Sequence, residues 1–218
     1  MKLVIFDFDG TIADSMWAWD NLGEDTLKEH NIPLLSDYRK VIRTMSVLNF
    51  SKYLTERYPV LGSAEELMDH WHEIMKVKYT TEIKLKPGII ELLETLKKRG
   101  YTLYLASATK YEVLMTAVKH FALEKYFSFI IAETMVNLSK YDPRFYQICV
   151  DRAGAKKEET YIFEDADHAV RTAKEAGYHV CAIKDKSMES KEEEIKHCAD
   201  LYQKDFTNVD ALLKFLGN

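Results

Sequence analysis

The chain has 218 residues, with 30 Lys and Arg against 35 Asp and Glu, so its formal net charge is −5 at pH 7. This length fits one large domain or a domain with an insert, the acidic balance argues against nucleic acid as a partner, and no apolar run approaches the roughly 20 residues of a membrane span. The first residues do not show the pattern of a secretory signal peptide, in which a charged segment precedes an apolar one. The three cysteines lack the spacing of metal ligands and suit a reducing compartment. We therefore expect a cytoplasmic protein.

The first strand is expected at residues 3–6, an apolar run typical of a strand that is buried on both faces. The run ends in Asp7 and Asp9, whose side chains point to the same side of an extended segment because they are two residues apart. Gly10 then allows a tight turn. Two carboxylates at this separation repel each other unless a cation or a shared proton is present. The pattern indicates either such a site or a solvated Asp-x-Asp-Gly turn.

Residues 15–84 contain little that resembles a strand and carry helical patterns with many aromatic side chains. A helical insert over this range would lie above Asp7 and Asp9, where a lid can exclude water and hold a substrate. Most of its aromatic residues are expected to form the insert's own core. Trp17 and Trp19, which are closest in sequence to the aspartates, are candidates for substrate contact.

From residue 87 onward, helical and strand patterns alternate strictly, and glycines stand where a helix needs a left-handed C-cap before the next strand. This alternation predicts an α/β fold, a doubly wound parallel sheet with helices on both faces. The expected domains are an α/β core of residues 1–14 and 85–218 and a helical cap of residues 15–84. The expected strands are 101–106, 127–132, 160–163, 178–183 and an edge strand at 199–202, and the expected helices are 89–96, 111–121, 142–153, 166–176 and 209–216.

Ligand sites in open parallel sheets lie at the carboxyl ends of the strands. The polar residues expected at or near those ends, besides Asp7 and Asp9, are Ser107, Thr109, Lys140, Glu164 and Asp165. Taken singly, each has an ordinary explanation as a helix cap or a surface side chain. Together at one edge of the sheet they indicate a site that contains a hydroxyl, an amine and several carboxylates.

These residues resemble the four motifs of the haloacid dehalogenase superfamily, namely Asp7-x-Asp9-Gly10-Thr11, the strand-end Ser107, Lys140 ahead of Asp142-Pro143, and Glu164-Asp165. The motifs occur in order, and the resemblance covers the whole chain, including a helical cap inserted after the first motif. It implies a Rossmann-like core. Tyr141 is a departure, because relatives usually have proline after the lysine, and we expect it to alter the loop more than the chemistry.

The resemblance also implies a role for each motif. Asp7 would be the nucleophile that forms an aspartyl-phosphate, and Asp9 would protonate the leaving oxygen and then activate water. Mg²⁺ would be held by Asp7, the backbone carbonyl of Asp9 and Asp165, with Glu164 acting in support or through water. Lys140 would stabilise the nucleophile and the transferring phosphoryl group. The residues implied to contact the substrate are Thr11, Ser107 and the amide of Ala108, in addition to the candidates Trp17 and Trp19.

Aspartate at position 9 favours phosphate esters, because cleavage of a carbon–halogen bond needs no acid for the leaving group. We expect a phosphatase that acts on a small phosphorylated metabolite, and the alternative is a β-phosphoglucomutase-type isomerase. Such mutases carry a histidine where Trp19 stands and a Gly-x-Ser-Arg segment, whose nearest match at 44–47 lacks the arginine although Arg43 is adjacent. A third hypothesis is a protein that binds phosphate compounds without turnover. The oligomeric state is left open, with a monomer as the default.

Overall fold

The central strand of the structure is β1 (Leu3–Phe6), which ends directly before Asp7. In this computed structural model, which describes residues 2–34, 38 and 45–217, all four side chains of β1 are fully buried. The strand pairs in parallel with a neighbour on each side, so its backbone donors and acceptors are satisfied within the sheet. A strand buried on both faces is what the continuous apolar run predicts.

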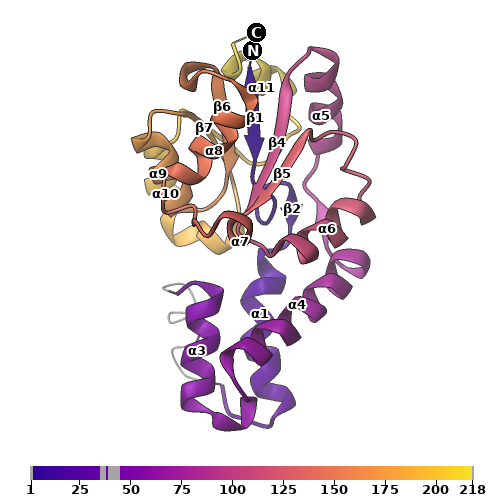
Figure 1. Ribbon diagram of the computed structural model, residues 1–218, viewed down its shortest axis with the longest axis vertical. Coiled ribbons are helices and arrows are strands. Elements are labelled where there is room, and N and C mark those ends of the chain that lie inside the picture. The colour runs from indigo at the N-terminus through magenta and orange to yellow at the C-terminus, as the bar shows by residue number, and fades with distance from the viewer. Residues whose placement is uncertain (1, 35–37, 39–44, 218) are drawn as a thin grey trace.

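Six of the described strands form a parallel sheet in the order β5-β4-β1-β6-β7-β8, drawn in the upper half of Figure 1. Besides β1, its members are β4 (Thr102–Ser107), β5 (Phe129–Ala132), β6 (Thr160–Glu164), β7 (His179–Ile183) and β8 (Leu201–Gln203). The predicted strands, including the edge strand, are therefore confirmed. Because the strands are parallel, their carboxyl ends meet at one edge.

Helices cover both faces of this sheet. Val4 and Phe6 pack into a cluster with α5 (Ile89–Lys98), α6 (Tyr111–His120) and α11 (Val209–Phe215). The alternate residues Leu3 and Ile5 belong to a second cluster on the opposite face. That cluster includes residues of α8 (Arg144–Ala153), α9 (Asp167–Glu175) and α10 (Glu192–Cys198). The fold is thus the predicted doubly wound, Rossmann-like α/β arrangement.

Between β1 and α5 the chain forms three described helices, which we call the insert helices: α1 (Met16–Glu29), α3 (Val47–Arg57) and α4 (Ala64–Thr81). They lie together beyond the carboxyl edge of the sheet, in the lower part of Figure 1. Aromatic side chains hold them together. The ring of Phe50 stacks on that of Trp71 with centroids 6.0 Å apart, and the Trp71 indole nitrogen donates to Thr26 Oγ1 at 2.8 Å.

The chain leaves and re-enters the α/β part through a short antiparallel pair, β2 (Ala13–Asp14) with β3 (Lys84–Leu85). Segments of two residues are too short to show a strand pattern in the sequence. Other short elements that the sequence did not predict are η1 (Pro59–Leu61), α7 (Glu133–Val136), η2 (Lys157–Glu159) and η3 (Lys186–Lys191). None of the helices in the described ranges is long and apolar enough to cross a membrane.

Candidate active site

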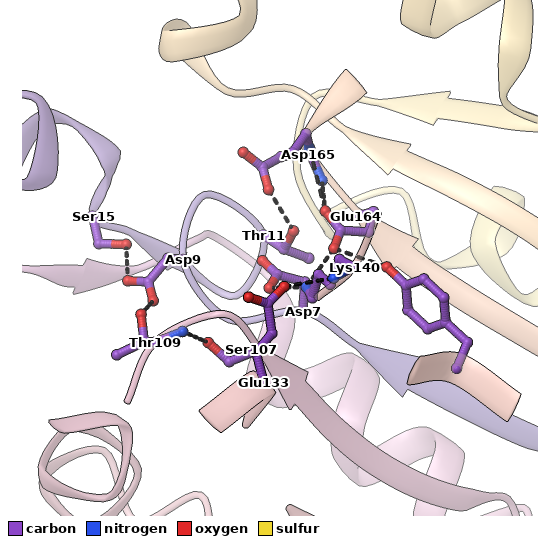
Figure 2. A network of polar contacts seen from close by, with 12 residues as sticks. Asp7, Asp9, Thr11, Ser15, Ser107, Thr109, Glu133, Lys140, Glu164 and Asp165 are labelled. Carbon is purple, nitrogen blue, oxygen red and sulfur yellow. Dashed lines mark hydrogen bonds and ion pairs between the residues drawn. The ribbon is translucent and has the colours of Figure 1, made fainter. Parts of the chain in front are cut away.

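The carboxyl edge of the sheet gathers the polar residues that the sequence places at strand ends (Figure 2). Asp7 follows β1, Ser107 is the last residue of β4, and Glu164 is the last residue of β6. β6 pairs with β1 in register, with Phe163 opposite Phe6, so Glu164 comes to lie beside Asp7. Lys140 reaches the same place from the loop before α8.

The Lys140 ammonium lies between two carboxylates. Its Nζ donates to Asp7 Oδ1 and to Glu164 Oε1, and all three side chains are buried. The Lys140 backbone nitrogen donates to Glu133 Oε1 at 2.5 Å, and the Tyr146 hydroxyl donates to Glu164 Oε1 at 3.3 Å. These contacts fix both ends of the lysine, so that a positive charge is held directly against Asp7.

Three carboxylates in this cluster could bind a metal ion. One oxygen each of Asp7, Glu164 and Asp165 lie within 4.8 Å of one another. Asp7 Oδ2 is buried and has no hydrogen-bond partner among the described residues, and such an atom is unfavourable unless a ligand fills the gap. Thr11 Oγ1 donates to Asp165 Oδ1 at 3.2 Å, and a side chain at Gly10 (φ +86°) would overlap the Asp165 carboxylate. The residues present therefore fit a hard divalent cation.

Burial raises the pKa of the Asp7 carboxyl to about 7, against the opposing effect of Lys140. Burial likewise raises the pKa of Asp165 well above its ordinary value, and Glu164 and Asp7 raise it further. Burial alone would lower the pKa of Lys140, but Asp7 and Glu164 outweigh it and hold that pKa well above the usual range. The cluster thus contains more buried negative charge than Lys140 can balance, which is a condition that a cation relieves.

The Asp9 carboxylate accepts hydrogen bonds from four side chains, and two of them come from the insert helices. Ser15 Oγ (2.7 Å), Trp19 Nε1 (3.2 Å) and the Tyr79 hydroxyl (2.5 Å) donate to Oδ1. Thr109 Oγ1, just beyond β4, donates to Oδ2 at 2.7 Å. The side chain of Asp9 is therefore oriented jointly by the α/β part and by α1 and α4.

Two of these partners, Ser15 and Tyr79, are absent from the residues that the sequence singled out. The other two, Trp19 and Thr109, are among them. Tyr79 lies 70 positions after Asp9, and only the folded arrangement of α4 brings it to the carboxylate. Thr109 follows a strand end, and its backbone nitrogen also donates to the oxygen of the buried Ser107 at 3.0 Å. Trp17 is held at the start of α1, where its indole nitrogen donates to the Asp14 carbonyl at 2.9 Å and the Lys78 ammonium lies 5.2 Å from its ring.

A cavity of about 500 Å³ lies between α4 and the start of α6, and Asp9 is not among the residues that line it. Its wall includes Lys110, the residue after Thr109, and His72, whose ring lies edge-on to Trp19 with centroids 6.5 Å apart. The side chains that line it are almost all charged or polar: Asp69, His70, His72, Glu73, Lys76, Lys110 and Glu112, together with Val113. A small hydrophilic group would fit it.

The sequence model of the haloacid dehalogenase-like hydrolase family matches residues 4–183 of the chain, and this range includes every motif described above. The chain belongs to this family. The phosphorylated carbohydrates phosphatase of Thermotoga maritima is 28% identical over 177 residues, covering 81% of this chain and 82% of that protein. The pyrophosphatase PpaX of Halalkalibacterium halodurans is 30% identical over 186 residues, covering 84% of this chain and 83% of that protein.

Solved structures share the fold of the chain over nearly all its length. CbbY from Rhodobacter sphaeroides, determined in complex with phosphate, superposes with a TM-score of 0.77 at 21% identity and covers 96% of each chain. A β-phosphoglucomutase from Clostridium difficile superposes with a TM-score of 0.76 at 16% identity, covering 100% of this chain and 97% of that chain. At these identities the likeness shows the fold alone.

The family match confirms the resemblance stated from the four motifs, while the role of each residue stays a prediction. The structure brings Asp7, Lys140, Glu164 and Asp165 into one buried cluster. Of the segment compared with the mutase signature, Arg43 and residue 44 lie outside the described residues. Ser46 caps α3 by accepting a hydrogen bond from the Asn49 backbone nitrogen.

Proposed function

We propose that this protein is a Mg²⁺-dependent phosphatase that hydrolyses a small phosphorylated metabolite through an aspartyl-phosphate. The observation that carries the proposal is the buried Asp7 carboxylate, paired with Lys140 and followed two residues later by an oriented Asp9. The family assignment and relatives that are named as phosphatases support a phosphoric monoester hydrolase.

In the first step, Asp7 would attack the phosphorus atom and form the covalent intermediate. Lys140 would hold the attacking carboxylate in place and stabilise the negative charge of the phosphoryl group as it is transferred. Ser107 and the amide of Ala108 would hold phosphate oxygens at the same edge of the sheet. Mg²⁺, held by Asp7, the backbone carbonyl of Asp9, Asp165 and, in support, Glu164, would offset the negative charge of the site and the substrate.

Asp9 would protonate the leaving oxygen and then take a proton from the water that hydrolyses the intermediate. Both tasks require a carboxyl group in a defined position beside the phosphoryl group. The hydrogen bonds from Trp19, Tyr79 and Thr109 support this role, because they restrict the carboxylate to one side of the site. Thr11 would act near the metal through its hydrogen bond to Asp165.

We further propose that residues 15–84 act as a cap over a core formed by residues 1–14 and 85–218. The leaving group would then extend from Asp9, past its partners Trp19 and Thr109, toward the cavity between α4 and α6. Its charged and polar lining favours a compact, hydroxyl-rich leaving group such as that of a sugar phosphate over a large apolar one. The Thermotoga maritima relative, named as a phosphorylated carbohydrates phosphatase, agrees with this choice.

The alternative activity is that of a β-phosphoglucomutase, which has the same fold. Its specific requirement, a histidine near the acid, is replaced here by Trp19, whose indole nitrogen can donate a hydrogen bond but cannot act as an acid or a base near neutral pH. We therefore place hydrolysis ahead of isomerisation. A cytoplasmic, monomeric enzyme remains our expectation for the location and the assembly.

The experiment is phosphate release from a panel of phosphorylated metabolites, measured with Mg²⁺ and with EDTA, alongside an assay for isomerisation of β-glucose 1-phosphate. The proposal predicts metal-dependent release that is strongest on sugar phosphates. The matched control is Asp7→Asn, which should abolish release while the protein remains folded. Isomerisation without net release would overturn the proposal in favour of the mutase. Release that is unchanged in Asp7→Asn would overturn the mechanism.

A further inference from the structure

A second buried ion pair, Lys86 with Asp185, lies next to the proposed metal site and has no part in the mechanism above. Lys86 Nζ donates to Asp185 Oδ2 at 3.1 Å and to the Lys184 carbonyl at 2.5 Å. Both side chains are less than a tenth exposed. A buried pair of this kind needs a reason, since an apolar pair of similar size is often no less stable.

The position of the pair in the fold brings it close to Asp165. β6 and β7 are neighbours with Glu164 opposite Ala182, so Asp165 and Asp185 both emerge from the carboxyl edge of adjacent strands. Lys86 follows β3, where the chain re-enters the α/β part, and its backbone nitrogen donates to the Ile12 carbonyl at 2.8 Å. The same turn carries Thr11, whose hydroxyl donates to Asp165.

The buried charges of the protein form a single group. Among the described residues, the charged side chains that are buried are four carboxylates and two ammoniums, namely Asp7, Glu164, Asp165, Asp185, Lys140 and Lys86. When all of them are ionised, the group carries two excess negative charges, which one divalent cation balances. After burial, Glu164 and Asp7, the charge of Asp185 further raises the pKa of Asp165 and that of Lys86 lowers it, so both members of the pair act electrostatically on this carboxylate.

Asp185 itself is fixed by further contacts. Its Oδ1 accepts hydrogen bonds from the Ser187 backbone nitrogen at 2.9 Å and from the Ser187 hydroxyl at 2.8 Å, at the start of η3. Because these bonds do not involve Lys86, the carboxylate should keep its place when the lysine is removed. Each charge of the pair can therefore be removed by substitution without displacing the other.

We propose that Lys86 and Asp185 are positioning residues that set the Mg²⁺ affinity of the site through their opposite charges. Asp185 attracts the cation and Lys86 repels it. The lysine thereby keeps the affinity for Mg²⁺ low enough that the bound ion can be released into solution. When the ion is absent, the positive charge of the lysine balances the negative charge of the Asp185 carboxylate. This inference rests on the proposed function, since it assumes Mg²⁺ at Asp7 and Asp165.

The test is titration of the metal-free protein with Mg²⁺ by calorimetry, without substrate, on Lys86→Met, Asp185→Asn and the double variant. Coulomb interaction predicts binding several-fold tighter in Lys86→Met, several-fold weaker in Asp185→Asn, and close to wild type in the double variant. The matched control is Lys184→Met, which breaks an exposed ion pair with Glu192 (2.8 Å) in the same loop and should leave Mg²⁺ affinity unchanged. If Lys86→Met does not fold, Lys86→Gln should show the same tighter binding.

Opposite shifts that cancel in the double variant would support the inference, because a purely structural role weakens binding in both single variants. Weaker binding in both, or no change in either, would overturn it while leaving the proposed function intact. A wild-type protein that binds no Mg²⁺ would overturn both the inference and the metal-dependent mechanism.

Discussion

Replacing Asp7 with asparagine should change how the stability of the metal-free protein depends on pH. In the folded protein the pKa of Asp7 is raised from 3.8 to about 7, because burial disfavours the charged carboxylate. A carboxyl group whose pKa is raised on folding holds its proton more tightly in the folded state. Its contribution to stability is therefore greatest at low pH and is lost as the pH rises toward the folded pKa. Asparagine does not titrate and cannot contribute this loss.

The size of the effect follows from the two pKa values. Each pH unit between them lowers the free energy of unfolding of the wild type by about 1.4 kcal/mol. The loss from this group is about 2 kcal/mol at about pH 5.5 and about 4 kcal/mol at about pH 8. Asparagine also removes a partner of Lys140, but that effect is constant over this range, because the pKa of Lys140 lies well above it. The stability difference between Asp7→Asn and wild type should therefore move by about 2 kcal/mol in favour of the variant.

The assay is urea unfolding in EDTA at both pH values, followed by far-UV circular dichroism. Asp142→Asn is the control. The Asp142 carboxyl is partly exposed, and Arg144 holds its pKa below the ordinary value, so it stays ionised over the whole range and its variant should show no such trend. A difference between Asp7→Asn and wild type that stays constant with pH, or that moves the other way, would refute the reasoning about the buried cluster.

Three further substitutions test individual contacts. Tyr79→Phe removes one of the donors to Asp9 and should lower kcat by about tenfold with little change in KM, whereas an equal rise in KM would point to a role in substrate binding. Lys140→Met should lower kcat by about a hundredfold or more and destabilise the fold by about 3 kcal/mol in urea, since two buried carboxylates lose their cation; near-wild-type activity would contradict its role. Gly10→Ala places a side chain against Asp165 at a positive φ and should weaken Mg²⁺ binding by about tenfold or more in calorimetry, and unchanged affinity would argue against Asp165 as a ligand.

Much of the fold could be predicted because its signals are local. Gly154, for example, ends α8 in the left-handed conformation that the sequence pattern requires, and the next strand begins a few residues later. The continuous apolar run at residues 3–6 identifies a strand that is buried on both faces. Parallel topology then brings the strand ends together, which is why the amino-acid sequence is enough to group Lys140, Glu164 and Asp165 with Asp7.

The remaining parts of the site depend on tertiary packing, which leaves no periodic signal. Tyr79 reaches Asp9 only because the fold places α4 beside the end of β1, and a tyrosine on a helix more often belongs to a core. Lys86 and Asp185 are 99 positions apart, and no motif marks either of them. Trp17 and Trp19 are two residues apart on a helix and point in different directions, so proximity in sequence could not decide which of them contacts the aspartate.

The most direct test of the mechanism is to trap the covalent intermediate. The protein would be mixed with Mg²⁺ and its best phosphorylated substrate, quenched in acid during turnover, and digested for peptide mass spectrometry. The account predicts a phosphoryl group on Asp7, which is absent when EDTA replaces Mg²⁺ and absent in Asp7→Asn. A phosphoryl group on another residue, or rapid turnover with no modified peptide at all, would contradict the central claim that Asp7 is the nucleophile.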